Sequence, residues 1–279
     1  MSLPAALQSY RREAALPLLL ALAPLLAGCG NGGSAAAAAP ALAARATPAE
    51  WEALDDAVPP RRLRDPRTGI TFIRVPAGEF RQVAADLSRT IRVSKPFLLA
   101  ETELTVAQWR RYIDDLGGDR ELPVPADDAL PMPLSWRDSE RFCARLGYRL
   151  PTEAEWELAC RADHGDAGPW STPAGLRDHA WFNANAGTGP QPVRGRSPNG
   201  FGFYDMIGNV WEWCSDWYGR FPFGTDPAPV DPIGPASGDG HALRGASWFT
   251  PGSPSPTYRT QDFVDTRNTF YGLRPAHDL

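Results

Sequence analysis

The chain has 279 residues, of which 43% are hydrophobic, so it can bury one sizeable core, and we expect one large domain. Ten tryptophans stand beside 29 prolines and 26 glycines, a composition that interrupts regular patterns often and excludes long helices. The net charge of -5, without a basic stripe, gives no electrostatic footprint for nucleic acid, which we exclude as a partner.

The amino terminus has the features of an export signal. Two arginines precede an apolar stretch, residues 14–26, which is too short to span a bilayer comfortably. The ending LAGC, residues 26–29, is similar to a bacterial lipobox, in which the cysteine becomes the lipidated first residue of the mature protein. We predict a lipoprotein signal peptide over residues 1–28 and lipidation at Cys29; an ordinary signal peptide or a short membrane anchor is the alternative.

Two regions follow the signal. Residues 29–67 begin with small residues of low complexity, which predicts a tether and lead-in without chemistry; a short helix near Ala41 is the alternative. Further on, Ile70, Phe72 and Val75 alternate with other residues before a Pro-Ala-Gly turn, which predicts an early strand. We therefore place one folded domain at residues 68–279.

Three short helices are predicted from capping boxes, in which two polar residues stand three positions apart. The pairs are Thr105 with Gln108, Ser135 with Asp138, and Thr152 with Glu155. Gly117 and Gly147 would end the first two helices, and the third would carry Trp156, Ala159 and Cys160 inward. After the third helix we expect mostly loop and short strand.

The segment GNVWEWCSDWYG, residues 208–219, raises the first question of chemistry, because Glu212 stands between two tryptophans. Three explanations compete: a buried core strip with an accidental acid, a sugar-stacking surface, and an ion site whose acid is held by packed indoles. The surrounding pattern does not show the exposure that a sugar platform needs. We therefore expect Trp211, Trp213 and Trp217 to be core anchors.

Four blocks of the sequence, in order, resemble one known family. They cover residues 133–162, 198–219, 243–249 and 271–276. Together they resemble the formylglycine-generating enzyme (sulfatase-modifying factor) domain family over roughly residues 68–277, and four ordered blocks are far more specific than one short motif. The resemblance implies an irregular, loop-rich α+β fold related to C-type lectins, which agrees with the composition.

The resemblance also implies a calcium site. Carried over residue by residue, it makes Asp205 and Glu212 side-chain ligands, and Gly208 and Val210 main-chain carbonyl ligands. This set suits calcium, which takes several oxygen ligands. The alternative is that Glu212 pairs with a buried arginine and binds no ion. The acidic insertion of the family's second site is not found, so we expect at most one calcium ion.

The resemblance also implies a chemistry for the oxidase members of the family. In them, two cysteines five positions apart bind copper(I), and the enzyme converts a substrate cysteine to formylglycine. The matching positions here hold Thr250 and Ser255. Copper(I) is soft and is held by thiolates, whereas hydroxyl groups are hard, poorly acidic donors. No cysteine follows Cys214, so a local realignment does not restore the pair. We expect neither copper nor formylglycine-generating activity.

Three cysteines remain after the lipidation site. The resemblance implies that Cys143 and Cys160 would bridge to cysteines near the carboxyl terminus, but Pro275 and Thr260 stand there. The two thiols either bridge each other or stay buried as small hydrophobes. Because the number is odd, at least one thiol has no intramolecular partner, and Cys214 is expected to be packed rather than reactive.

Histidines give no sign of an iron site. Some relatives are iron-dependent sulfoxide synthases, in which histidines hold the metal largely from an additional helical domain. The histidines here are scattered, without a pair at helical or strand spacing, and stand at positions 164, 179, 241 and 277. We expect surface histidines and no iron.

These features together predict an exported, lipid-anchored protein of a bacterial cell envelope that faces the periplasm, with the choice of inner or outer membrane left open. We expect a non-oxidase binding or accessory module whose ligand is a peptide, a protein or a glycan. The alternatives are an enzyme of the same family with a different chemistry, such as peptide or metabolite maturation, and a purely structural envelope lipoprotein. Fold alone does not decide among them.

Overall fold

The computed structural model describes residues 50–279 except residues 60, 85–86, 119, 163, 166 and 220–228. The predicted signal peptide, Cys29 and the chain up to residue 49 therefore lie outside the described residues. Among the helices that are described, none has the length and apolar character needed to cross a bilayer.

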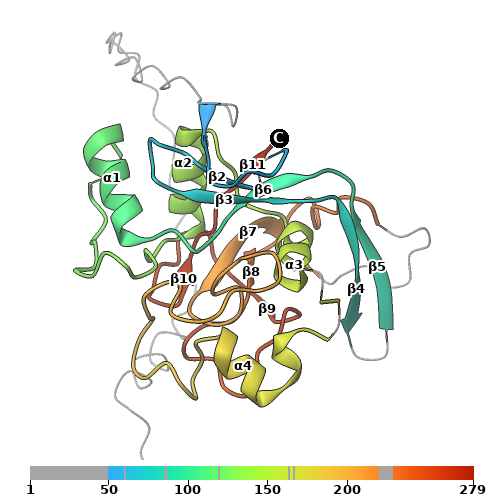
Figure 1. Ribbon diagram of the computed structural model, residues 1–279. Helices are drawn as coiled ribbons and strands as arrows, with labels where there is room; N and C mark the ends of the chain where they lie inside the picture. Colours follow the sequence, from blue (N-terminus) through green and yellow to red (C-terminus); the bar gives the residue numbers. More distant parts are fainter. Residues whose placement is uncertain are drawn as a thin grey trace, which may run out of the picture. The chain divides into compact units, whose positions relative to one another are not determined.

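The described residues form three sheets (Figure 1). An antiparallel five-stranded sheet has the order β1-β2-β3-β6-β11, with bounds Glu52–Ala53, Arg62–Arg64, Thr71–Val75, Phe97–Ala100 and Ala276–Asp278. A four-stranded sheet has the order β10-β7-β8-β9, with bounds Tyr271–Gly272, Trp211–Trp217, His241–Arg244 and Arg259–Asp262. In it β10 runs parallel to β7 and the other pairs are antiparallel. A separate hairpin pairs β4 (Gly78–Ala84) with β5 (Leu87–Val93).

The folded part begins earlier than residue 68. Strand β2 pairs with β3 and β1 pairs with β2, so the end of the predicted lead-in joins the five-stranded sheet. Trp51 is buried and contacts Phe72 in a tilted arrangement, with ring centroids 4.8 Å apart. The low complexity that suggested a tether stops before this tryptophan, whose ring needs a core to cover it.

The three predicted helices are confirmed as α1 (Val106–Leu116), α2 (Trp136–Leu146) and α3 (Glu153–Arg161), and each begins with a complete capping box. Gly117 and Gly147 end α1 and α2 in the left-handed conformation that glycine adopts readily. A 3₁₀ turn (Pro169–Ser171) and α4 (Pro173–His179) were not predicted, although Thr172 caps α4 and Pro173 occupies its first turn.

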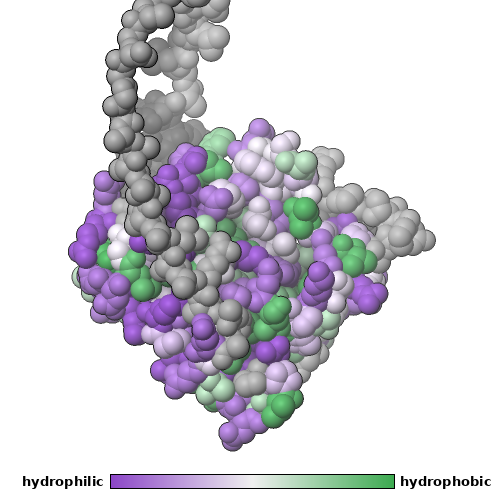
Figure 2. All heavy atoms as spheres, turned by 90° about the horizontal axis from the view of Figure 1, so that it is seen from above, coloured by the Kyte–Doolittle hydropathy of each residue, from purple (hydrophilic) through white to green (hydrophobic). Residues whose placement is uncertain are grey.

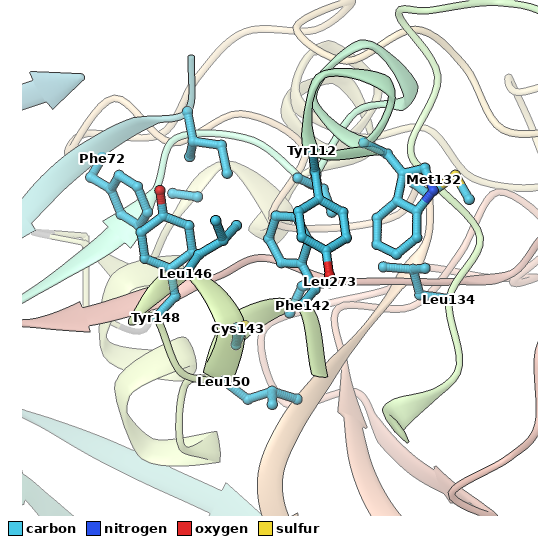
Figure 3. Packing of buried hydrophobic residues seen from close by; sticks show 14 of the residues in the cluster. Phe72, Tyr112, Met132, Leu134, Phe142, Cys143, Leu146, Tyr148, Leu150 and Leu273 are labelled. Carbon is cyan, nitrogen blue, oxygen red and sulfur yellow. The ribbon is translucent and has the colours of Figure 1, made fainter. Parts of the chain in front are cut away.

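Two clusters of buried side chains hold these elements together. The first packs α1 and α2 against the five-stranded sheet, and Figure 3 shows Phe72 beside Tyr148 and Tyr112 beside Phe142. The second surrounds α3, where Trp156 is fully buried. The face drawn in Figure 2 is mainly hydrophilic, with small separate hydrophobic patches. The loop-rich α+β fold predicted from the sequence is confirmed.

The three cysteines that the structure describes are unbridged. Cys143, Cys160 and Cys214 are all free and buried, so the second of the two explanations for Cys143 and Cys160 holds. Burial in apolar surroundings raises the pKa of each thiol above its ordinary value. These side chains therefore behave as small hydrophobic residues rather than as nucleophiles.

His241 corrects the expectation of surface histidines. Its ring is 3% exposed and lies between two indoles, with centroids 3.7 Å from Trp136 and 3.9 Å from Trp217. Its Nδ1 lies 3.0 Å from the carbonyl oxygen of Ser215. The prediction of core anchors holds fully only for Trp213, because Trp211 and Trp217 are half-buried.

Candidate functional site

A shallow aromatic cavity of about 230 Å³ is lined in part by Thr250, one of the two residues that match the copper-binding cysteines of the oxidases. We call it the aromatic groove, and its lining residues are Trp211, Ser247, Phe249, Thr250, Pro251, Phe270 and Tyr271. Phe270 stacks on Trp248 at 5.0 Å and contacts Phe249 at 5.8 Å between ring centroids. Phe249 is 46% exposed, so part of this aromatic surface faces solvent.

At the two positions that match the copper ligands, the side-chain hydroxyl groups form hydrogen bonds within the protein. Thr250 lines the groove, and its Oγ1 accepts a hydrogen bond from the backbone N–H of Ser247 at 3.0 Å. Ser255 is not among the lining residues, and its hydroxyl lies 2.9 Å from that of Thr257. The residues that line the groove include neither a cysteine nor a charged side chain. The groove therefore offers stacking and hydroxyl contacts.

Glu212, the acid between two indoles, forms a buried ion pair. Arg274 donates to it from Nη2 at 2.7 Å and from Nε at 2.9 and 3.1 Å, and Trp156 donates from Nε1 at 2.6 Å. Glu212 and Arg274 are both fully buried. The same guanidinium also donates to the backbone oxygens of Ala100 and Tyr204, so it ties β6 and the segment before β7 to this strand.

The ion pair gives Glu212 the buried arginine partner that was weighed against the ion site. Both of its oxygens accept hydrogen bonds from Arg274, and Oε2 also accepts one from Trp156, so a cation at Glu212 would share this carboxylate with them. The role of Glu212 as a calcium ligand stays a prediction. A fully paired, hydrogen-bonded carboxylate is what a buried charge requires.

Two other acids lie close to this pair without full pairing. Asp205 is 2% exposed; its Oδ2 accepts the backbone N–H of Arg194 at 2.7 Å, and its Oδ1 has no hydrogen-bond partner. Glu103 is fully buried and neither of its oxygens has a partner. Sequence reasoning missed Glu103, because no local pattern marks it.

Burial dominates the electrostatics of these acids. It raises the pKa of Asp205 to about 6, against the lowering effect of the Arg194 N–H. It raises the pKa of Glu103 well above its ordinary value, and the negative charge of Asp205 adds to the rise. Both carboxyl groups have oxygens without a hydrogen-bond partner. A cation bound beside them would compensate the negative charge of their ionised forms.

The turn before β7 contains a backbone position that only glycine can occupy. Gly208 has φ of 84°, and a Cβ there would meet the Trp181 backbone oxygen at 2.0 Å, so only glycine fits. Across the described ranges, no three or more His, Cys, Asp or Glu side chains converge as a metal group. A cation here would therefore rely on Asp205 and on carbonyl oxygens such as those of Gly208 and Val210, which suits calcium.

Comparison with known proteins agrees with this architecture. The chain is 37% identical over 164 residues to the formylglycine-generating enzyme of Thermomonospora curvata, covering 52% of this chain and 54% of that protein. It is 32% identical over 180 residues to the inactive C-alpha-formylglycine-generating enzyme 2 of Mus musculus, covering 58% and 50%. The chain thus spans about half the length of these curated relatives.

A solved structure and a family match complete the comparison. Treponema denticola variable protein 1 superposes with a TM-score of 0.65 at 26% identity, over 75% of this chain and 95% of that one. Residues 59–279 match the sulfatase-modifying factor enzyme 1-like domain, a range that contains most of the described strands, all of the described helices, the aromatic groove and the Glu212–Arg274 pair. The chain therefore belongs to the family of that domain.

Proposed function

We propose that this chain is an exported, lipid-anchored binding or accessory module of a bacterial envelope, without formylglycine-generating oxidase activity. The observation that carries the proposal is the lining of the aromatic groove, where Thr250 presents a hydroxyl and no thiol. Copper(I) chemistry needs soft ligands, and each of the described cysteines is buried with a raised pKa. A family that includes a protein named as inactive is compatible with this proposal.

The ligand of the aromatic groove is a peptide, protein or glycan segment that presents an uncharged face. Aromatic rings bind apolar side chains and sugar faces through stacking and burial, while the hydroxyls of Ser247 and Thr250 orient a polar group. A charged ligand group would lose its hydration without gaining an ionic partner from the lining residues.

We also propose that one calcium ion binds next to β7, the strand whose Trp211 lines the groove, at Asp205 and the carbonyls of Gly208 and Val210. The support is the unpartnered Oδ1 of Asp205 and the neighbouring unpartnered carboxyl of Glu103. The ion would compensate two buried acids that Arg274, already bound to Glu212, does not pair with directly.

The oxidase part is tested with a peptide that contains a Cys-x-Pro-x-Arg core, incubated with the purified protein and copper(I). We expect the mass of the peptide to stay unchanged, because conversion of the thiol to an aldehyde would lower it. The formylglycine-generating enzyme of Thermomonospora curvata serves as the positive control. Copper-dependent conversion by the unmodified protein would refute the non-oxidase proposal.

The binding part is tested on arrays of neutral oligosaccharides and of uncharged peptides, followed by titration of the best ligand. Phe249→Ala should weaken the binding of that ligand about tenfold or more, because truncating an aromatic anchor removes stacking area. Phe263→Ala is the matched control, since Phe263 is 68% exposed but does not line the groove. Equal effects of both substitutions would place the ligand elsewhere.

A further inference from the structure

A second cavity, of about 370 Å³, lies away from the aromatic groove and shares no lining residue with it. It is bounded by the β4–β5 hairpin, the start of α3, the end of β7 and residues 229–235, and α3 contacts both the hairpin and β7 (Figure 1). Its volume falls within the range of small-molecule sites. We call it the hairpin cavity.

The wall of the hairpin cavity is mostly apolar. Phe80 and Ile91 come from the hairpin, Ala154 from α3, and Trp217 from β7. Ile233 also lines it and is 71% exposed, so apolar surface continues to the rim. Burial of such surface by a ligand favours binding, because it removes apolar area from water. The cavity therefore suits a ligand with an apolar body.

One buried acid in this wall lacks a positive partner. Asp216 is 4% exposed, and its Oδ2 accepts the Glu153 backbone N–H at 3.0 Å and the Ser215 hydroxyl at 3.3 Å. Within the described part of the chain, no Lys, Arg or His forms an ion pair with Asp216. The Glu153 carboxylate raises the pKa of Asp216 further, so a cation that binds beside Asp216 would favour its charged form.

The basic side chains of the cavity are engaged with other groups. Arg259 donates to Glu153 at 2.6 and 2.8 Å and to the Gly219 carbonyl oxygen at 2.9 Å. Arg89 donates from Nε to Gln82 at 3.2 Å. The charge of Arg259 is thus balanced by Glu153, and Asp216 remains the acid whose charge a ligand can complement.

We propose that the hairpin cavity binds a small amine, with its protonated amino group on the Asp216 carboxylate and its apolar body against Phe80, Ile91 and Trp217. A charge-assisted hydrogen bond to a largely dry carboxylate is stronger than a neutral one, and this supplies selectivity for the amine. The site is independent of the aromatic groove and of the function proposed for it.

The pH dependence of binding is a second signature. Burial, followed by the charge of Glu153, raises the pKa of Asp216 to about 7, so the carboxylate forms as the pH rises through this value. Arg259 and Arg89 line the same cavity, and the His241 Nδ1 lies 3.1 Å from the Asp216 carbonyl oxygen. An alkylamine stays protonated over this range, so amine affinity should increase from about pH 6 to about pH 8.

The test uses three matched probes in calorimetric titration at pH 8: phenethylamine, 2-phenylethanol and phenylacetate. We expect the amine to bind about tenfold or more tightly than the alcohol, the gain that a charge-assisted hydrogen bond gives. Asp216→Asn, which keeps the shape of the side chain, should remove this preference. Asp178→Asn removes an exposed acid on α4 and should leave it unchanged.

A second variant separates the apolar wall from the acid. Ile233→Ala changes an exposed rim residue and should weaken the amine and the alcohol by the same factor, whereas Asp216→Asn should weaken only the amine. Tightest binding of phenylacetate, equal binding of amine and alcohol, or no binding of any probe by a folded protein would each overturn the proposal. Circular dichroism melting checks that every variant is folded.

Discussion

Glu212 and Arg274 form a fully buried ion pair that joins β7 to the segment just before β11, 62 positions apart in the sequence. Arg274 also binds two backbone oxygens, and Trp156 on α3 binds the same carboxylate. One pair therefore joins the five-stranded sheet, the four-stranded sheet and α3, close to the bend that begins at Asp205. It gives the acid among the tryptophans a structural role.

Removal of one partner should be costly. Arg274→Met leaves Glu212 buried without a counter-charge, and we expect the free energy of unfolding to fall by about 3–5 kcal/mol. Arg137→Met is the control, because the Arg137–Asp265 pair is exposed and should lose only about 0–1 kcal/mol. Urea unfolding at pH 7 measures both. Similar losses in the two variants would mean that the buried pair contributes no more than a surface pair.

Calcium should raise the melting temperature, because an ion that binds only the folded state stabilises it by mass action. Asp205→Asn should remove this rise, since it replaces the negatively charged carboxylate, whose Oδ1 has no hydrogen-bond partner, with a neutral amide. Glu212→Gln should retain the rise, because its carboxylate is already engaged by Arg274. Thermal unfolding in calcium and in chelator measures the effect. A melting curve indifferent to both would reject the calcium site.

The sequence could predict what is local. The three capping boxes lie within a few residues of each helix start, so α1, α2 and α3 were found. Helix α4 was missed because Pro173 and Gly175 look like loop residues, although Thr172 followed by Pro173 is a start signal. The resemblance named Asp205 and Glu212 together as ligands, and the structure places them on the bend before β7 and on β7 itself.

The sequence could not predict what depends on distant pairing. The partner of Glu212 comes from another block of the sequence, and no spacing rule connects it to β7. Glu103 is fully buried next to Leu104, whose N–H donates to the distant Leu273 carbonyl oxygen at 2.7 Å. His241 is enclosed by indoles from α2 and β7. Such burial is set by tertiary packing, which local patterns do not encode.

Lipidation is predicted at Cys29, which lies outside the described residues. Cys29→Ser should release the protein from membranes or leave an unprocessed precursor, because the substitution removes the thiol to which the lipid would be attached. Mass spectrometry of the mature amino terminus, with membrane fractionation, measures this. An unmodified chain that starts at another residue would contradict the lipoprotein assignment. Cys143→Ser is the control, because that thiol is buried in the folded domain.

Asp216 should make stability depend on pH. Burial, and then the charge of Glu153, raises its pKa from 3.8 to about 7, so the folded state holds this proton more tightly than the unfolded state does. The stability gained from the protonated form is therefore complete below pH 3.8 and is lost as the pH rises through about 7.

The substitution Asp216→Asn should remove this dependence, because the amide does not ionise and its oxygen can still accept the Glu153 N–H. The free energy of unfolding of the variant, minus that of the wild type, should increase by up to about 1.4 kcal/mol per pH unit between about pH 4 and 7. Above pH 7 the difference should level off. Urea unfolding at pH 5, 6, 7 and 8 measures it, with Asp178→Asn as the control. A difference that stays constant over this range would show that Asp216 titrates as an ordinary acid, and it would also remove the pH signature expected for amine binding in the hairpin cavity.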